Sequence, residues 1–370
     1  MTDTTTATGT TTATGGSAAG PGARERFPDR LRDRLGRRVS LRGWGGVGGM
    51  AAVCALTAVT LLPLSRGAGN AVTGGGTGSV QSATVAAPAA AGEACTAPET
   101  SLPPSTAGGP NIAEIEKRGK LIVGVDQNSY RWGYRDPVSD DLKGFDIDLA
   151  RAIAENILGS RDAVIFRAIP TNQRIPALNS DTVDLVVRTM TINCARAEQV
   201  AFSTAYFEVG QQVLASKGSD ITGYDTSLKG KRVCSAEGST AYEALEKNAF
   251  GAVFKDAHDG GPADEDILTV PNQLDCLVRL QEGLADAVVT DNALAAGQAA
   301  QDPAVELKGR RFTSEYYGVA AKLGKDDLVR RVNHVLEEYR EVAWKKAYRH
   351  WLADDLPGIS GPPAPKYRQP

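Results

Sequence analysis

The amino-acid sequence predicts an α/β fold of two Rossmann-like lobes joined by a two-stranded hinge. Short apolar runs alternate with helical segments over residues 111–207, and the alternation repeats over residues 217–310. The chain then returns through Tyr317–Lys322 into a long helical pattern at 326–352. Alternating strands and helices are typical of parallel sheets covered by helices. A chain that leaves one block, builds a second and returns must cross between them twice.

The first block is expected to begin with a helix whose start is a capping box, Asn111 with Glu114, and whose end is Gly119. The apolar run that follows ends in Asp126, which is typical of a buried parallel strand with a polar residue at its carboxyl end. Further along we expect a helix at 146–158 closed by Gly159, a strand at 164–166, a short helix at 174–178 and a strand at 183–187.

The second block repeats this order. We expect strands at 231–234, 267–270 and 287–289, with helices from 239 to about 248, at 274–281 and after Asp291. The first crossing is placed at Val209–Ala215, and the last helix, 326–352, is amphipathic. The predicted lobe 1 is therefore 111–209 plus 315–356, the predicted lobe 2 is 210–314, and 357–370 is a tail.

The N-terminal part of the chain indicates export. Residues 1–46 are rich in small polar residues and then in arginine, so we expect a disordered, basic cytoplasmic segment. Residues 47–64 carry no charge and are just long enough to span a bilayer. Arginines precede this segment, which places the N-terminus inside and the rest outside. Residues 65–110 are expected to form a flexible linker.

The segment 47–64 has several interpretations. It is an uncleaved signal anchor or a cleaved signal peptide; residues 37–42 loosely resemble a twin-arginine signal. A buried core helix is disfavoured because Gly and Pro surround the segment. Lipid modification at Cys54 is disfavoured because that residue lies in the middle of the apolar run. The expected location is the extracytoplasmic face of the cell membrane, with the protein anchored by this segment or secreted after cleavage.

Cysteine usage agrees with export. Four cysteines follow the apolar segment, Cys95, Cys194, Cys234 and Cys276. An even number outside the cell suggests two disulfides, for which three pairings are possible; the alternative is four free, buried thiols. The sequence has no C-x-x-C motif or His/Cys cluster, so no metal site and no cofactor are predicted.

The formal net charge is −3, and no basic stripe runs through the predicted lobes. This balance argues against nucleic acid as a partner. We expect a monomer.

Ligands of open α/β sheets bind beyond the carboxyl ends of the strands. Here that rule selects Asp126, residues 189–196, residues 238–240 and residues 290–291. Arg196 can hold a carboxylate through two parallel hydrogen bonds. The helix start at Gly238 and Thr240 offers free N–H groups to an anion, and Asp291 can pair with an ammonium group. Each residue alone is more often a surface charge or a helix cap, so the hypothesis of an α-amino acid site depends on their joint placement.

At these positions the sequence resembles a known family, the family 3 bacterial extracellular solute-binding proteins, which are polar amino-acid receptors of ABC importers. Within it, the chain is most similar to an actinobacterial branch of glutamine-, glutamate- and aspartate-binding proteins. The resemblance covers about 111–353 and implies the type II periplasmic-binding-protein fold. It is carried by Leu121–Asp126, Gly144–Asp148, Thr189–Arg196, Phe202-Ser203, Gly230–Thr240 and Asp286–Asp291.

The resemblance also implies a role for each matching residue. Arg196 would grip the ligand α-carboxylate, assisted by the backbone near Thr189 and Thr191. Asp291 would take the α-ammonium, Thr240 would stand at the lobe 2 helix start, and Asp126 would lie at the pocket edge.

Three positions depart from the pattern of the family and bear on the identity of the ligand more than on its class. An aromatic clamp is replaced by Thr171, an acidic residue by Ala195, and the usual glycine by Thr189.

The spacing of the cysteines is also similar to that branch. We predict the pairs Cys234–Cys276, within lobe 2, and Cys95–Cys194, which would tie the end of the linker to lobe 1.

A second arginine, Arg174, follows the strand at 164–166 and could reach the same cleft, although it could equally be a surface residue. A second cationic donor suits a ligand whose side chain ends in a carboxylate or a carbonyl. The predicted ligands are therefore glutamate, aspartate, glutamine and asparagine.

Three functions are compatible with this fold. The first is binding without chemistry, with lobe closure read by an ABC permease; the second is the same binding read by a membrane sensor protein. The third is a dehydratase-type enzyme on the same fold. None of His258, His334 and His350 lies near the cleft motifs, and no catalytic triad, metal cluster or carboxylate pair can be placed there. We therefore predict a binding protein and not an enzyme.

Overall fold

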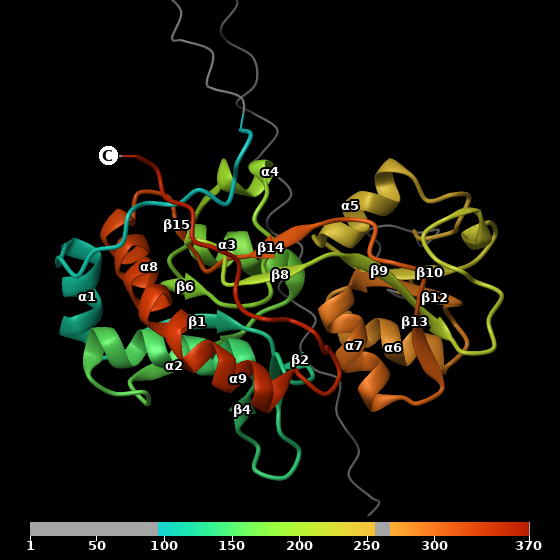
Figure 1. Cartoon of the computed structure of the whole chain (residues 1–370), viewed down its shortest axis with the longest axis horizontal. Helices are drawn as coiled ribbons and strands as arrows, with labels where there is room; N and C mark the ends of the chain where they lie inside the picture. The colour runs from blue at the N-terminus through green and yellow to red at the C-terminus, as the bar shows by residue number, and fades with distance from the viewer. Residues whose placement is uncertain (1–94, 256–266, 370) are drawn as a thin grey trace, which may run out of the picture. The chain divides into compact units, whose positions relative to one another are not determined.

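The computed structural model describes residues 95–255 and 267–369 (Figure 1). The predicted segments 1–46 and 47–64, most of the predicted linker, Cys54 and His258 lie outside the described residues. None of the helices within 95–255 and 267–369 is both long and apolar enough to cross a membrane.

Helices and strands follow the predicted alternation. The helices are α1 (Pro110–Arg118), α2 (Phe145–Leu158), α3 (Arg174–Asn179), α4 (Cys194–Ala197), α5 (Thr240–Lys247), α6 (Gln273–Gln281), α7 (Asn292–Gln301), α8 (Asp326–Glu341) and α9 (Ala343–Trp351), with 3-10 turns η1 (Thr171–Gln173) and η2 (Thr226–Leu228). The strands are β1 (Leu121–Val125), β2 (Asn128–Ser129), β3 (Gly133–Arg135), β4 (Leu142–Lys143), β5 (Val164–Ala168), β6 (Leu185–Val186), β7 (Val200–Phe202), β8 (Phe207–Val209), β9 (Gln211–Ser216), β10 (Val233–Ala236), β11 (Thr269–Val270), β12 (Ala287–Asp291), β13 (Val305–Lys308), β14 (Glu315–Tyr317) and β15 (Ala320–Lys322).

Two five-stranded sheets form the centres of two lobes. The sheet of lobe 1 has the order β5-β1-β6-β15-β7, and the sheet of lobe 2 has the order β11-β10-β12-β9-β13. Between them, β8 pairs antiparallel with β14, so that Glu315 lies opposite Val209 (Figure 1). The prediction of two α/β lobes joined by a two-stranded hinge is confirmed.

The prediction that the sheets are parallel is only half right. β1 pairs parallel with β5 and β6, and β10 pairs parallel with β11 and β12. By contrast, β9 runs antiparallel to β12 and β13, and β15 runs antiparallel to β6 and β7. The antiparallel strands β9 and β15 are the first strands that the chain enters after each hinge crossing, so each follows a hinge strand and not a helical crossover.

The core of lobe 1 contains a cluster of aromatic rings beside the hinge. Trp132 stands edge-on to Phe207 of β8 and to Tyr317 of β14, with ring centroids 4.8 and 5.6 Å apart. Phe145 at the start of α2 and Trp344 of α9 pack against the same group. Because the hinge strands carry rings of this buried cluster, their lobe 1 ends are held in place by packing.

Two predicted helices differ from the structure. The capping box at Asn111 and Glu114 is wrong: Gly109 is the N-cap of α1, and Oδ2 of Asp327 accepts hydrogen bonds from the backbone N–H groups of Asn111 and Ile112. The cap therefore comes from a residue far along the chain. The single helix expected at 326–352 is two helices, because Val342 leaves helical geometry at φ −133° and ψ −48°.

Both predicted disulfides are present. Cys95 joins Cys194 with the Cα atoms 5.7 Å apart, and Cys234 joins Cys276 with the Cα atoms 5.5 Å apart. These separations are in the usual range for a disulfide.

The described end of the predicted linker is ordered against lobe 1, contrary to the prediction for residues 95–110. Ser101 is buried, and its Oγ donates to the carbonyl oxygen of Phe202. Nδ2 of Asn333 in α8 donates to Oγ of Ser101. The tail lies beside this segment, since Ser101 donates to the backbone of Lys366 and accepts from that of Arg368. Local composition did not reveal this pairing because its partners are more than 200 residues apart.

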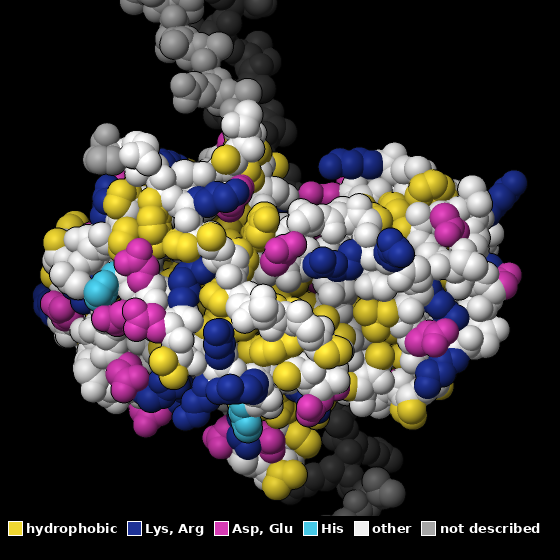
Figure 2. Space-filling model, viewed as in Figure 1, with side chains coloured by type: hydrophobic (Ala, Val, Ile, Leu, Met, Phe, Trp, Pro, Cys, Tyr) yellow, Lys and Arg dark blue, Asp and Glu magenta, His cyan; other side chains and the backbone are white. Residues whose placement is uncertain are grey.

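The visible surface of the lobes carries both signs of charge. Figure 2 shows Lys and Arg side chains interspersed with Asp and Glu over this face, without a continuous basic stripe.

Candidate functional site

A small polar cavity lies at the carboxyl ends of the parallel strands, with walls from both lobes. Its volume is about 10 Å³, which is room for about one water molecule. Six of the eight predicted site residues line it. The lining consists of Thr171, Arg174, Arg188, Thr189, Thr191, Arg196, Ser239, Thr240, Gln273, Asp291 and Leu294.

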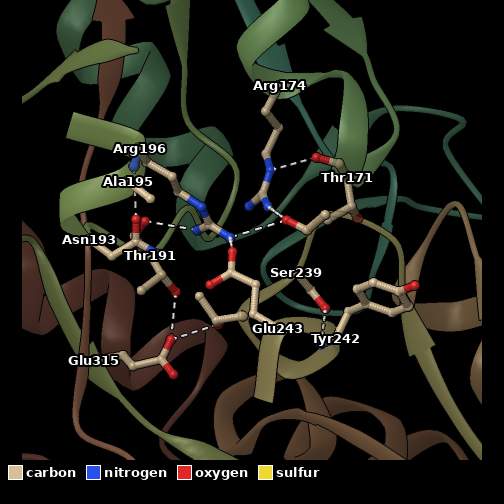
Figure 3. Close-up of polar contacts among 12 residues, drawn as sticks. Thr171, Arg174, Thr191, Asn193, Ala195, Arg196, Ser239, Tyr242, Glu243 and Glu315 are labelled. Atoms are coloured by element: carbon tan, nitrogen blue, oxygen red, sulfur yellow. Dashed lines mark hydrogen bonds and ion pairs between the residues drawn. The ribbon is translucent and has the colours of Figure 1, made fainter. Parts of the chain in front are cut away.

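Arg196 reaches the cavity from the short helix α4. The helix start is fixed by Asn193, whose Oδ1 accepts from the backbone N–H of Arg196 at 2.9 Å. Nη1 of Arg196 donates to the carbonyl oxygen of Thr191 at 2.8 Å, and Nη2 lies 3.6 Å from Oε1 of Glu243 in α5 (Figure 3). The side chain is buried, and this burial lowers the pKa of the guanidinium. The guanidinium of Arg196 is therefore fixed in position, with Nη2 directed toward lobe 2.

Arg174 reaches the same place from α3. Its Nε donates to the carbonyl oxygen of Thr171 at 2.8 Å. The side chain is 4 % exposed, so the interpretation of Arg174 as a surface residue is wrong. Burial, followed by the charges of Arg196 and Arg188, lowers its pKa well below the usual value for arginine. An anion placed between these groups would relieve that repulsion.

Both arginines donate to one oxygen. The carbonyl oxygen of Gly238 accepts from Nη2 of Arg174 at 3.0 Å and from Nη2 of Arg196 at 3.1 Å. Gly238 adopts φ +71°, and a Cβ at this position would lie 3.0 Å from Cα of Asn172 in lobe 1. A glycine is therefore required for this close approach of the lobes. The predicted anion-binding helix start contributes a carbonyl acceptor to these contacts.

Asp126 stands behind the cavity and does not line it. Its carboxylate accepts from the backbone N–H groups of Gln127 and Asn128 and from Oγ of Ser129. Oδ2 lies 3.1 Å from Nη2 of Arg188, and both side chains are almost fully buried. Arg188, which sequence analysis missed, is the group that reaches the cavity, while Asp126 balances its charge.

Thr189 holds a strained backbone conformation. Its φ is +40°, in a region that β-branched residues rarely adopt. Asp146, at the start of α2, accepts from the backbone N–H of Thr189 at 2.8 Å and from Oη of Tyr206 at 2.8 Å. Burial raises the pKa of Asp146 to about 7. The positive φ of Thr189 gives a physical reason why a glycine suits position 189.

Asp291 is the acidic group of the lobe 2 wall. It is the N-cap residue of α7, but its side chain makes no capping bond and lies instead in the cavity. Oη of Tyr317 donates to Oδ2 at 2.5 Å, and Nε2 of Gln211 donates to Oδ1. Burial and the nearby charge of Glu315 raise the pKa of Asp291 to about 7, although Tyr317, Arg174 and Gln211 oppose the shift.

Several lining atoms have no hydrogen-bond partner among the described residues. They are Oγ1 of Thr171, Oε1 of Gln273, and Nε and Nη2 of Arg188, whose contact with Asp126 lacks hydrogen-bond geometry. Buried polar atoms are normally paired, because an unpaired one costs about 1–3 kcal/mol. The cavity thus presents unused donors on lobe 1 and an unused acceptor on lobe 2.

The sequence pattern did not single out Arg188, Gln273 and Leu294, nor Thr171 as a lining residue, whereas Ser239 lies within the predicted helix start at 238–240. Arg188 and Gln273 closely follow strands β6 and β11, so the rule that located Asp291 could have found them. Leu294 lies inside α7 and has no such signal.

Known proteins are similar to most of the part of the chain that the structure describes. Residues 121–354 match the bacterial extracellular solute-binding proteins, family 3. This chain belongs to that family. Its relatives include the ABC transporter glutamine-binding protein GlnH of Bacillus subtilis, 32 % identical over 66 % of this chain and 85 % of the relative. The glutamine-binding protein of Geobacillus stearothermophilus is 35 % identical over 59 % of this chain and 78 % of the relative.

Solved structures of related binding proteins share the fold of this family 3 protein. An ancestral arginine-binding protein bound to glutamine is 36 % identical, with a TM-score of 0.56 over 64 % of this chain and 98 % of that protein. The solute receptor for L-cysteine of Neisseria gonorrhoeae is 26 % identical, with a TM-score of 0.59 over 66 % of this chain and 94 % of that receptor.

Proposed function

We propose that this family 3 protein binds one polar amino acid between its lobes and releases it unchanged. The predicted ligands are glutamate, aspartate, glutamine and asparagine. The observation that carries the proposal is the convergence of Arg174 and Arg196, both buried, on the single carbonyl oxygen of Gly238. Two buried guanidinium groups that meet at one acceptor can each bind a separate carboxylate or carbonyl group of one ligand.

The α-carboxylate is assigned to Arg196. The cavity holds about one water molecule while Gly238 keeps its contacts, so an amino acid enters only when lobe 2 moves away. A ligand carboxylate would then replace the Gly238 oxygen and gain charge-assisted hydrogen bonds. This exchange links binding to lobe movement.

The α-ammonium is assigned to Asp291 on the opposite wall. Its carboxylate is held by Tyr317 and Gln211, which are neutral donors, so among the described residues it has no cationic hydrogen-bonding partner, and burial together with the charge of Glu315 raises its pKa. An ammonium group would supply that partner.

The ligand side chain is assigned to Arg174, Arg188 and Gln273. Arg188 offers unused N–H donors, and Gln273 offers an unused carbonyl oxygen. Carboxylate and amide side chains can use such groups. Thr171, where relatives would carry an aromatic clamp, leaves no ring to stack on a large apolar side chain. The names of two relatives, both glutamine-binding proteins, are consistent with this class of ligand.

We infer that the protein works outside the cytoplasm and passes the occupied state to an ABC importer or a membrane signalling partner. The family is extracellular, which supports the location. We propose that the protein is either attached to the membrane through residues 47–64 or secreted after this segment is cleaved. Binding without catalysis is favoured over a dehydratase because His334 and His350, on α8 and α9, do not line the cavity.

The test is a thermal-shift screen of the protein against the amino acids, followed by calorimetry. A ligand at 100 times its Kd adds about 2.7 kcal/mol of stability. We expect a polar amino acid to raise Tm and to be recovered unchanged by mass spectrometry. Turnover of the ligand, or stabilisation by leucine alone, would contradict the proposal.

A further inference from the structure

Glu315 lies at the hinge and contacts both lobes, although it does not line the ligand cavity. It is the first residue of β14, and its side chain is half-buried. Its Oε2 accepts from Oγ1 of Thr191 in lobe 1 at 2.9 Å (Figure 3). The same oxygen accepts from Oγ1 of Thr240 in lobe 2 at 2.8 Å. Both threonines line the cavity.

The Glu315 carboxylate is itself fixed in orientation. Oγ1 of Thr313 donates to Oε1 at 2.8 Å. Nε2 of Gln211, whose two protons are directed to Asp291 and Thr240, also lies 3.3 Å from Oε2. The hydroxyl of Thr313 is held in turn, because it accepts from the backbone N–H of Gln211 at 2.8 Å. Oε2 therefore keeps its direction toward the two cavity threonines.

A carboxylate accepts hydrogen bonds and cannot donate them, and a threonine hydroxyl has one proton and two lone pairs. The protons of Thr191 and Thr240 are therefore both committed to Glu315. Toward the cavity, Thr191 can only accept. Thr240 also accepts from Nε2 of Gln211 at 2.9 Å, which leaves it one free lone pair.

We propose that Glu315 is a specificity-determining positioning residue, which turns the hydroxyls of Thr191 and Thr240 into acceptors for the ligand ammonium. This inference rests on the proposed function. The wall made by Asp291 and the two hydroxyls then presents only acceptors to the α-ammonium. A ligand without the ammonium would leave these acceptors unpaired, so the wall selects amino acids against carboxylic acids that lack the amino group.

The experiment compares two pairs of probes, L-glutamate with glutarate and L-glutamine with glutaramate. In each pair the second compound lacks the α-amino group. Calorimetry at about pH 8.5 keeps Asp291 deprotonated, because its pKa is about 7. The quantity measured is the ratio of the Kd of the analogue to the Kd of the amino acid.

Glu315→Leu removes the acceptor and frees the hydroxyl protons to point into the cavity. We expect the ratio to fall by at least about tenfold, mainly through weaker binding of the amino acid. Glu208→Leu is the matched control, because Glu208 lies on the neighbouring hinge strand β8 and is exposed. It should leave the ratio unchanged.

A second pair of variants tests the same idea without altering the charge of Glu315. Thr191→Val removes the hydroxyl and should lower the ratio, whereas Thr191→Ser keeps the hydroxyl and should preserve it. The inference is overturned if Glu315→Leu and Thr191→Val weaken both members of each probe pair by the same factor. If the wild type binds none of glutamate, glutamine, aspartate and asparagine, the proposed function fails as well, which is a different result from binding with an unchanged ratio.

Discussion

The two walls of the cavity differ in charge. Lobe 1 supplies Arg174, Arg188 and Arg196, and its acidic residues Asp126 and Asp146 stand behind the surface, where they hold Arg188 and Thr189. Lobe 2 supplies acceptors instead, chiefly Asp291 and the hydroxyl of Thr240. An α-amino acid carries one charge of each sign. We therefore propose that the arginines of lobe 1 bind the anionic end of the ligand, that Asp291 and Thr240 of lobe 2 bind its ammonium together with the hydroxyl of Thr191, and that only a zwitterion satisfies both.

The largest effect is expected from removing Arg196, the central cation of the lobe 1 wall. Arg196→Ala should abolish detectable binding of amino acids, because losing the partner of a buried carboxylate costs about 2–5 kcal/mol. Calorimetry measures the affinity, and the circular dichroism spectrum checks that the fold is intact. Near-wild-type affinity in a folded variant would remove Arg196 from the site.

A second substitution tests whether Arg174 contacts the side chain of the ligand. Arg174→Ala should weaken glutamate binding by about tenfold to a hundredfold, because a hydrogen bond to a charged group contributes about 1.5–3 kcal/mol. Competitive calorimetry with glutamate, glutamine, leucine and arginine tests it. If leucine or arginine binds best to the wild type, the specificity proposed here is wrong. If glutamate binds best and the variant is unaffected, Arg174 does not contact the ligand.

The acidic wall should make binding depend on pH. The pKa of Asp291 is raised to about 7 by burial and by Glu315, so this carboxyl group is protonated in an increasing fraction of molecules below pH 7. An ammonium ligand favours the deprotonated form and hence releases a proton when it binds. Affinity should rise about tenfold from pH 6 to pH 8 and then level off. Titrations in buffers of different ionisation enthalpy would detect the released proton; an equal affinity at both pH values would argue against contact with Asp291.

The smallest expected effect concerns the backbone of lobe 1. Thr189→Gly should relieve the strain at φ +40° and stabilise the fold by about 1 kcal/mol. Thr189→Ala keeps a Cβ and should give little of this gain, which makes it the matched control. Urea unfolding of both variants provides the measurement. Equal stability of the two would show that the positive φ carries no cost.

The sequence predicted the lobes, the hinge and most of the cavity because those features have local signatures. Arg196 and Asp291 follow apolar strands, and the fold brings strand ends together. Glu315 had no such signature: its role depends on two hydroxyls 75 and 124 residues away. The cap that Asp327 provides for α1 is equally distant from its partner in the chain. Contacts of this kind are set by topology, and a single sequence does not encode them in any neighbouring pattern.

The attachment of both described chain ends to lobe 1 has a mechanical consequence. Cys95 is bonded to Cys194, two residues before Arg196, and the backbone near Ser101 pairs with that near Tyr367. Lobe 2 carries neither end, and its covalent connection to these points runs only through the hinge. A load applied to the two ends would therefore pass through lobe 1 and bypass the hinge. Labels or surface attachments placed at either end would leave the swing of lobe 2 unhindered.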